Sequence, residues 1–97
     1  MTNLETNALR ITELLYPDID INGIEKYKHF FSSYNGLMPI VYECNQSSID
    51  CSITMNRYQI KAYPEDGIDI YNYSSEPEFI EALQLACIKY LELKCGC

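Results

Sequence analysis

Tryptophan is absent from this sequence, histidine occurs once, and the four glycines are isolated from one another. The missing glycine cluster excludes the P-loop and the dinucleotide-binding fingerprint, which need several glycines close together. A metal site that depends on several histidines is excluded because His29 stands alone. No apolar run approaches the roughly 20 residues that span a bilayer, and the start of the chain lacks the basic and apolar regions of a signal peptide. The sequence therefore predicts a cytoplasmic protein with no membrane segment.

Basic residues are also scarce, with 7 lysines and arginines against 14 aspartates and glutamates, giving a formal net charge of -7. Such a surface repels phosphate backbones and anionic membranes, so we expect neither nucleic acid nor membrane as a partner. The natural complement is a protein with a basic surface. The apolar share of 47% and the charged share of 22% are ordinary for a globular chain, which argues against disorder.

Cysteine, in contrast, is frequent, with five residues. Without a signal peptide, free thiols are expected rather than a disulfide framework. Cys95 and Cys97 are close enough in sequence to bind one metal ion or each other, and the sequence leaves both alternatives open beside a simple frayed terminus. The paired Cys-x-x-Cys spacing of structural zinc sites is absent. We therefore predict no metal and no cofactor.

No catalytic centre is indicated either. Nothing in the sequence pairs His29 with a cysteine, as a Cys–His nucleophile requires. The closely spaced carboxylates, such as Asp18 and Asp20, fall in turns or at exposed strand positions, where a solvated surface is the ordinary explanation. The sequence thus predicts a protein that is not an enzyme.

The N-terminal third of the chain begins with a predicted helix. Thr2 and Glu5 have the spacing of a capping box, apolar residues then recur at helical intervals, and Pro17 ends the helix. Residues 18–33 support either a short strand or a helical stripe, with a turn at residues 22–23.

A second helix is predicted over Gly36–Asn45, with Asn35 as its cap and Pro39 in its first turns. The competing interpretation is a strand at residues 40–42. The helix is favoured because apolar residues fall at positions i, i+3, i+4 and i+7, the stripe of an amphipathic helix. These residues are Leu37, Ile40, Val41 and Cys44.

The C-terminal helix has the clearest pattern. Ser75 and Glu78 form a second capping box, Pro77 lies in the first turn, and Gly96 stops the helix. Its apolar stripe consists of Phe79, Leu83, Ala86, Cys87, Tyr90 and Leu91. The residues expected mostly off this stripe are Glu81, Gln84, Lys89 and Glu92.

Alternating apolar and polar residues predict three strands, at residues 49–55, 58–62 and 68–73. Turn residues separate them at 56–57 and 64–67. The predicted fold class is therefore α+β, a three-stranded antiparallel meander flanked by helices in the order helix–helix–strand–strand–strand–helix. We expect a single domain over residues 1–97. Within it, residues 1–33 form an N-terminal helix and connector, and residues 34–94 form the helix–three strands–helix core.

The stretch from His29 to Val41 places aromatic residues before Leu37-Met38-Pro39 and two β-branched residues on the predicted helix. This arrangement resembles a motif of small phage and prophage proteins that are similar to the phage ABA-sandwich domain, and the resemblance extends over residues 34–93. The aromatic position in that pattern is usually a tryptophan, which this chain lacks. The resemblance implies strands between helical layers and an accessory protein of a mobile element. It carries no catalytic residues.

Acidic residues and tyrosines gather between the second strand and the last helix. Tyrosine is enriched in binding surfaces because it offers a large area and a polar tip at low entropic cost. The predicted partner-binding residues are Tyr63, Glu65, Asp66, Asp69, Tyr71, Tyr73 and Glu76. The alternative is that these rings pack between the sheet and the helices.

The leading functional hypothesis is a non-enzymatic acidic binding protein of a phage or mobile element. One version is an inhibitor of a host nucleic-acid-handling defence system (anti-CRISPR-like), with carboxylates standing where phosphates would bind. The alternative is a structural or assembly accessory protein that associates with itself. The identity of the partner and the oligomeric state are left open.

Overall fold

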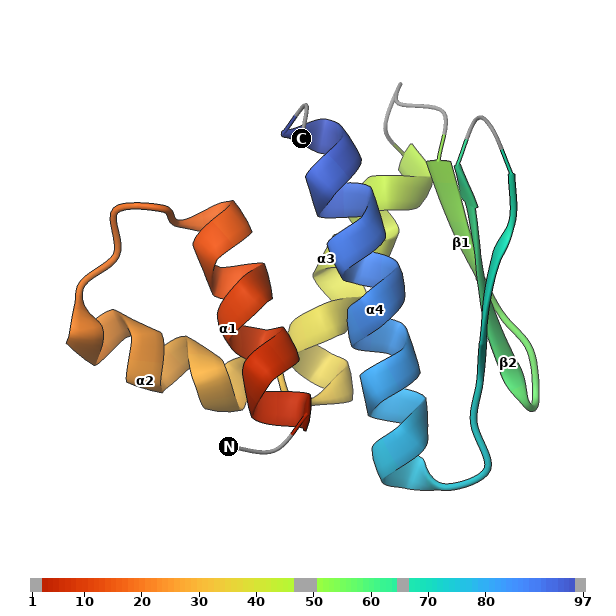
Figure 1. The fold of residues 1–97 in the computed structure, drawn as a ribbon, viewed down its shortest axis with the longest axis horizontal. Helices are drawn as coiled ribbons and strands as arrows, with labels where there is room; N and C mark the ends of the chain where they lie inside the picture. The colour runs from red at the N-terminus through yellow and green to blue at the C-terminus, as the bar shows by residue number, and fades with distance from the viewer. Residues whose placement is uncertain (1–2, 47–50, 65–66, 96–97) are drawn as a thin grey trace.

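The computed structural model describes residues 3–46, 51–64 and 67–95 (Figure 1). These residues form four α-helices and one three-stranded antiparallel sheet with strand order β1-β2-β3. In chain order the elements are α1 Asn3–Leu15, α2 Ile21–Phe30, α3 Tyr34–Gln46, β1 Cys51–Met55, β2 Gln59–Pro64, β3 Asp69–Asn72 and α4 Glu76–Lys94. The predicted α+β class and three-stranded meander are confirmed. The helix order gains α2, which occupies part of the segment that the sequence left ambiguous.

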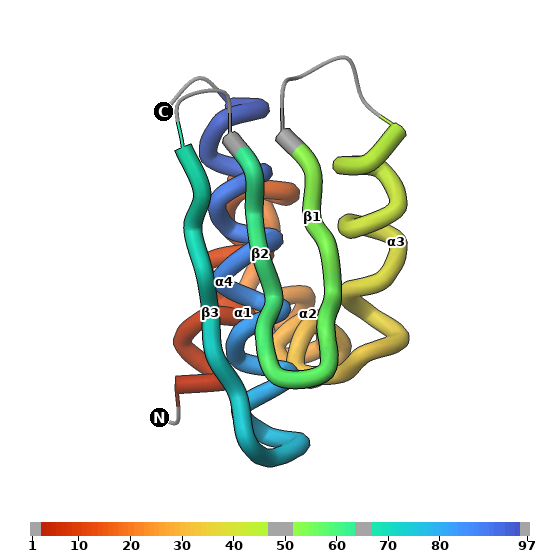
Figure 2. The backbone as a smooth tube through the Cα atoms, turned by 90° about the vertical axis from the view of Figure 1, so that its right-hand side faces the viewer, coloured from red at the N-terminus to blue at the C-terminus, as the bar shows by residue number. Residues whose placement is uncertain are grey.

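The described helices all lie on one side of the sheet (Figures 1 and 2). α4 and α3 pack against the sheet, α1 packs on α4, and α2 packs on α1. The sheet is therefore an outer layer in the described part of the chain, not a layer between helices as the phage ABA-sandwich resemblance implies. The reason lies in the strands, which bury apolar residues such as Ile53 and Ile60 on one face only, whereas Thr54 and Asn72 on the other face are exposed.

α1 follows the predicted pattern, because Ala8 and Ile11 are buried and the helix ends two residues before Pro17. Thr2 of the first predicted capping box lies outside the described residues. These buried residues make α1 a contributor to the same core as α3, α4 and the sheet, although the sequence assigned it to a segment separate from the core.

α2 corrects the prediction of a turn at residues 22–23. Asp20 is the N-cap, and its side chain accepts a hydrogen bond from the Gly23 backbone N–H at 2.8 Å. This bond satisfies one of the free amides at the start of a helix, so residues 22–23 continue the helix instead of reversing the chain. No α2 residue is buried. Aromatic stacking fixes the helix, with the Tyr27 ring 4.9 Å from Tyr16 and 5.5 Å from Phe31.

α3 confirms the helical interpretation of the segment around residues 40–42, and the predicted apolar stripe is buried. The predicted cap, Asn35, is wrong. The Ser33 hydroxyl accepts a hydrogen bond from the Gly36 N–H at 3.3 Å, so the helix starts earlier and Asn35 lies in its first turn. Glycine is required at position 36 because a Cβ there would collide with the Phe30 carbonyl. Pro39 lies inside the helix at an exposed position.

The sheet places Ile53, Ile60 and Ala62 against the helices. β1 pairs with β2 with Ile53 opposite Ala62, and β2 pairs with β3 with Ile60 opposite Tyr71. On β3 the tyrosine is the half-buried residue that packs on the core, whereas Ile70 on the other face is 49% exposed. The predicted turn at residues 64–67 falls partly outside the described residues.

α4 confirms the second N-terminal signal. Ser75 is the N-cap, and its hydroxyl accepts a hydrogen bond from the Glu78 N–H at 3.4 Å. The Glu78 carboxylate in turn accepts from the Ser74 hydroxyl at 3.1 Å. The helix ends at Lys94 with Cys95 as its C-cap, and the predicted stop at Gly96 lies outside the described residues.

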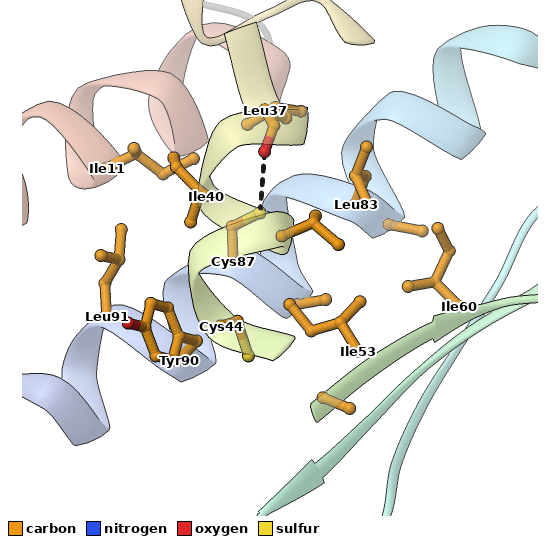
Figure 3. Packing of buried hydrophobic residues seen from close by; sticks show 14 of the residues in the cluster. Ile11, Leu37, Ile40, Cys44, Ile53, Ile60, Leu83, Cys87, Tyr90 and Leu91 are labelled. Atoms are coloured by element: carbon orange, nitrogen blue, oxygen red, sulfur yellow. Dashed lines mark hydrogen bonds between the residues drawn. The ribbon is translucent and has the colours of Figure 1, made fainter. Parts of the chain in front are cut away.

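The core is built around α4, which contributes more buried residues than any other described element (Figure 3). Leu83 faces the sheet near Ile60, and the Cys87 thiol points toward the Leu37 carbonyl of α3 with a sulfur–oxygen distance of 4.0 Å. α1 covers another side of the helix. α4 is therefore buried over most of its circumference, which explains why its apolar residues exceed one stripe.

Gln84 corrects the sequence analysis, which placed it mostly off the apolar stripe. Its side chain is fully buried, because α1 packs against that side of α4. The Nε2 group donates to the Leu4 carbonyl at 2.9 Å and to the Phe31 carbonyl at 2.8 Å. Its Oε1 atom is buried without a hydrogen-bond partner among the described residues. One amide thus joins α4 to the start of α1 and to the connection between α2 and α3.

We expect the Gln84→Leu variant to lower the free energy of unfolding by about 2–3 kcal/mol, because the buried Phe31 carbonyl and the part-buried Leu4 carbonyl each lose a donor. Urea unfolding followed by circular dichroism measures this difference. The matched control is Gln46→Leu, which makes the same change at an exposed position of α3 and should shift stability by less than about 0.5 kcal/mol. Equal stability of the two variants would show that the Gln84 bonds do not hold the helices together.

Candidate partner-binding groove

The two edges of the sheet differ in how their backbone groups are satisfied. At the β1 edge, Asn45 of α3 acts like a short piece of strand. Its Oδ1 accepts from the Ile53 N–H at 2.8 Å, and its Nδ2 donates to the Ile53 carbonyl at 3.1 Å. α3 lies beside this edge (Figure 2). The middle of the β1 edge is therefore occupied.

The β3 edge has no such cover in the described part of the chain (Figure 2). The Tyr73 N–H donates to the Tyr58 carbonyl at 3.0 Å, so this pair belongs to the hydrogen-bonded class of an antiparallel ladder. Hydrogen-bonded pairs occur at every second residue of an antiparallel ladder. Tyr71, which lies opposite Ile60, is therefore also a hydrogen-bonded position. The backbone N–H and C=O groups of Ile70 and Asn72 consequently point away from β2, toward the open edge.

A groove of about 400 Å³ runs between this edge and α4. Three of its lining residues come from β3, and the other four repeat at i, i+3, i+4 and i+7 along one face of α4. The β3–α4 groove is lined by Ile70, Tyr71, Asn72, Glu78, Glu81, Ala82 and Leu85. Its floor is apolar at Ala82 and Leu85, and its helical rim is acidic. A strand edge, an apolar floor and an acidic rim therefore meet in one place.

The two carboxylates on the rim keep their negative charge available. Glu78 accepts from the Ser74 hydroxyl, and Glu81 accepts from the Asn3 amide at 3.4 Å, so both hydrogen-bond donors are neutral. The nearby Lys89 is 3.6 Å from Asp69, and each of these two side chains is 40% exposed. Among the described residues, Lys89 is the lysine closest in sequence to Leu85 of the groove. It is already paired with a carboxylate that does not line the groove.

The predicted binding residues do not form one face. Tyr63 lies on the open face of β2, whereas Asp69, Tyr71 and Tyr73 alternate with the exposed residues of β3 and face the helices. Glu76 is exposed in the first turn of α4. Glu65 and Asp66 lie outside the described residues. Packing between sheet and helices, the alternative to a binding role, holds for Tyr71 and Tyr73, and Tyr71 also lines the β3–α4 groove.

A second hollow, of about 540 Å³, lies where the β1–β2 turn meets the start of α4. It is lined by Arg57, Tyr58, Tyr73, Ser74, Ser75, Glu76 and Phe79. Arg57 lies 5.3 Å over the Tyr58 ring, and the Tyr73 hydroxyl donates to the Asn56 carbonyl at 2.6 Å. The Ser75 hydroxyl caps α4. Arg57, Tyr73 and Ser75 of this hollow are therefore engaged within the protein, unlike the backbone groups at the open edge of β3.

The cysteines that the structure describes do not assemble a reactive centre. Cys44 and Cys87 are buried thiols that form no disulfide, and Cys95 is exposed with its sulfur 3.7 Å from the Leu14 carbonyl. Burial, with the neighbouring Cys44 as a second cause, raises the pKa of the Cys87 thiol well above its usual range. Among the described residues, no three His, Cys, Asp or Glu side chains come together in a way that would hold a metal ion. The alternatives that the sequence leaves open for Cys95 and Cys97 all involve Cys97, which lies outside the described residues.

Comparison with protein-family models, with curated proteins and with solved structures finds no match to this chain. The helices that the structure describes include none with the length and apolar character needed to cross a membrane.

Sequence reasoning missed the helical side of the groove. Glu78 was assigned to a cap, Glu81 to the polar side of α4, and Leu85 to neither; their i, i+3, i+7 spacing is what indicates that they line one strip. The predicted meander places β1 and β3 at the two edges of the sheet, but which edge stays uncovered was missed, because helix placement decides it. The sequence signal is the pair Ile68 and Ile70 flanking Asp69 in a short predicted strand, and the structure leaves both isoleucines exposed.

We expect Asn45→Ala to lower the free energy of unfolding by about 1–3 kcal/mol, because the Ile53 N–H and C=O lose their partners at the β1 edge. Gln46→Ala is the control, since it shortens the next exposed side chain of the same helix. Thermal and urea unfolding of the two variants measure the difference. An Asn45→Ala protein as stable as the control would mean that water replaces the amide at no cost.

We also expect iodoacetamide to modify Cys95 in the folded protein while leaving Cys44 and Cys87 unmodified, because both are buried away from the reagent and burial also raises the pKa of Cys87, whereas the thiolate is the reacting form. Peptide mass spectrometry after a short exposure at neutral pH measures this. The same reaction in concentrated urea, where all three thiols should be modified, is the control. Rapid labelling of Cys87 in the folded state would contradict the described packing.

Proposed function

We propose that this chain is a non-enzymatic, acidic protein-binding module whose partner presents basic residues. The observation that supports this best is the β3–α4 groove, where an open strand edge lies beside the carboxylates of Glu78 and Glu81. Acidic groups at the rim of an interface steer a basic partner and fix its orientation. The net charge of -7 acts in the same direction over longer distances.

The non-enzymatic part of the proposal is supported by the placement of Cys87 and His29, the side chains that nucleophilic catalysis would need. The Cys87 thiol is buried with a raised pKa, which keeps it protonated and weakly nucleophilic. His29 is exposed on α2, on the outer helix of the fold. Neither residue contributes to the β3–α4 groove.

The more specific prediction is an inhibitor, carried by a phage or mobile element, that acts in the cytoplasm against a host nucleic-acid-handling defence protein. Its support is the charge, because a surface rich in carboxylates resembles a phosphate backbone to a basic groove. A chromosomal setting among anti-defence genes would favour this version.

A second candidate function is an assembly protein that associates with itself. Ile68 and Ile70, 59% and 49% exposed, lie beside the free edge of β3 and would be covered if two copies paired through their sheets. Light scattering at increasing protein concentration tests this candidate, and a constant monomeric mass would contradict it.

We expect immobilised protein to retain basic proteins from a bacterial lysate at about 50 mM salt and to release them at about 500 mM, because screening weakens exposed charge contacts. The Glu78→Gln, Glu81→Gln double variant should retain at least about fivefold less of the same proteins. Quantitative mass spectrometry of the retained fraction measures both effects.

The control is the Glu13→Gln, Glu25→Gln double variant, which removes the same charge from exposed positions on α1 and α2, where Arg10 and Lys28 are the ion-pair partners. It should retain basic proteins nearly as well as the original chain. Equal losses in the two double variants would show that net charge, rather than the groove, attracts the partner. Retention of no basic protein at either salt concentration would contradict the proposed function.

A further inference from the structure

We infer that the β3–α4 groove binds an extended segment of the partner by adding it to the sheet as a fourth strand next to β3. The inferred segment alternates basic and apolar residues. This inference rests on the proposed function and specifies the site, the binding mode and the chemistry of the partner.

The backbone of β3 supplies the first part of the argument. Ile70 and Asn72 present their N–H and C=O groups to the open edge, as the alternation of the ladder requires. An extended chain lying about 4.8 Å away would satisfy these groups without any rearrangement of the sheet. Because β3 has four residues, a segment of about five residues is long enough to cover it.

The contrast between the two sheet edges assigns the added strand to β3. Asn45 already satisfies the Ile53 N–H and C=O at the β1 edge, and α3 lies alongside. A strand could join there only by breaking these bonds. Adding a strand at β3 breaks no hydrogen bond that the described residues form with the Ile70 or Asn72 backbone.

Alternation of side chains then fixes the pattern of the segment. Residues opposite Ile70 and Asn72 lie on the open face of the sheet, where Ile70 is half exposed and favours an apolar neighbour. Lys61 lies opposite Ile70 on the same face, so a basic residue is disfavoured at this place. The residues between them face α4, where Glu78 and Glu81 favour lysine or arginine.

The same charges favour a partner over a second copy of this chain. Two copies that paired through β3 would bring their Glu78 and Glu81 carboxylates to the same junction, in addition to a net charge of -7 on each copy. Like charges placed opposite one another in a sheet are destabilising. A basic segment turns the same carboxylates into attractive contacts.

The test uses the heptapeptide acetyl-Gly-Lys-Val-Lys-Val-Lys-Gly-amide and the full chain, with binding followed by nuclear magnetic resonance. We expect the largest shifts at the amides of Ile70 and Asn72 and along the groove face of α4. N-methylation of both valines should weaken binding at least about tenfold, because it removes the two N–H groups that would pair with β3. N-methylation of two lysines, whose N–H groups would face away, should change affinity by less than about twofold.

Variants of the protein provide the complementary measurement. Ile70→Pro removes one edge N–H at a position where the sheet itself does not use it, so the fold should persist, and peptide affinity should fall at least about tenfold. Ile70→Val retains the N–H and should bind within about twofold of the original. Circular dichroism confirms folding, and the methylated peptides decide the question if Ile70→Pro does not fold. Glu78→Gln with Glu81→Gln should weaken binding about fivefold.

Several outcomes would overturn the inference. Equal affinity for the valine-methylated and lysine-methylated peptides would mean that charge alone attracts the peptide, and the proposed function would stand without strand addition. The same conclusion follows if basic proteins are retained by the immobilised chain but the heptapeptide does not bind. A dimer that Ile70→Pro dissociates would show that a second copy occupies the edge. Failure of both peptide binding and retention of basic proteins would contradict the inference and the proposed function together.

Discussion

The buried amide of Gln84 is the interaction on which the arrangement of the helices depends. Its Nε2 group reaches the carbonyls of Leu4 and Phe31, which are 27 residues apart in the chain and belong to different segments. Two good hydrogen bonds offset the cost of an unpartnered Oε1 in the interior. Because both acceptors are fixed backbone groups, the start of α1 and the α2–α3 connection must lie at set distances from α4. Apolar packing alone would allow these helices to slide, since it has no preferred direction.

The central position of α4 also determines where the β3–α4 groove lies. One side of the helix carries Leu83 and Cys87 toward the sheet and α3, and another carries Gln84 toward α1. With 3.6 residues per turn, a third strip remains that contains Glu81 and Leu85. This strip runs beside β3. α4 therefore packs into the core on two sides and presents an acidic strip to the open edge of β3 on the third. The groove is a consequence of how the core is built.

Local patterns in the sequence were enough for most of the fold but not for the site. Period-two alternation and the Ser75 cap predicted the strands and α4, because those signals arise from neighbours in the chain. Gln84 was misplaced because its acceptors come from helices far away in sequence, which no local pattern reveals. The cap of α2 at Asp20 was missed because a glycine nearby suggested a turn. Tyr71 was grouped with acidic neighbours by proximity in sequence, although alternation along β3 turns its ring toward the core.

Acidity and an open strand edge fit together as two parts of one arrangement. A free edge is a hazard for any protein, since its unpaired N–H and C=O groups invite association with other chains. At β1 this hazard is removed by a hydrogen-bonding side chain, Asn45. At β3 it is limited instead by charge, because Glu78 and Glu81 disfavour a second acidic chain at the same place. A hydrogen-bonded cover would block every partner, whereas negative charge disfavours only acidic partners. Under the proposed function, carboxylates beside the open edge would disfavour a second copy of the chain there and favour a basic segment.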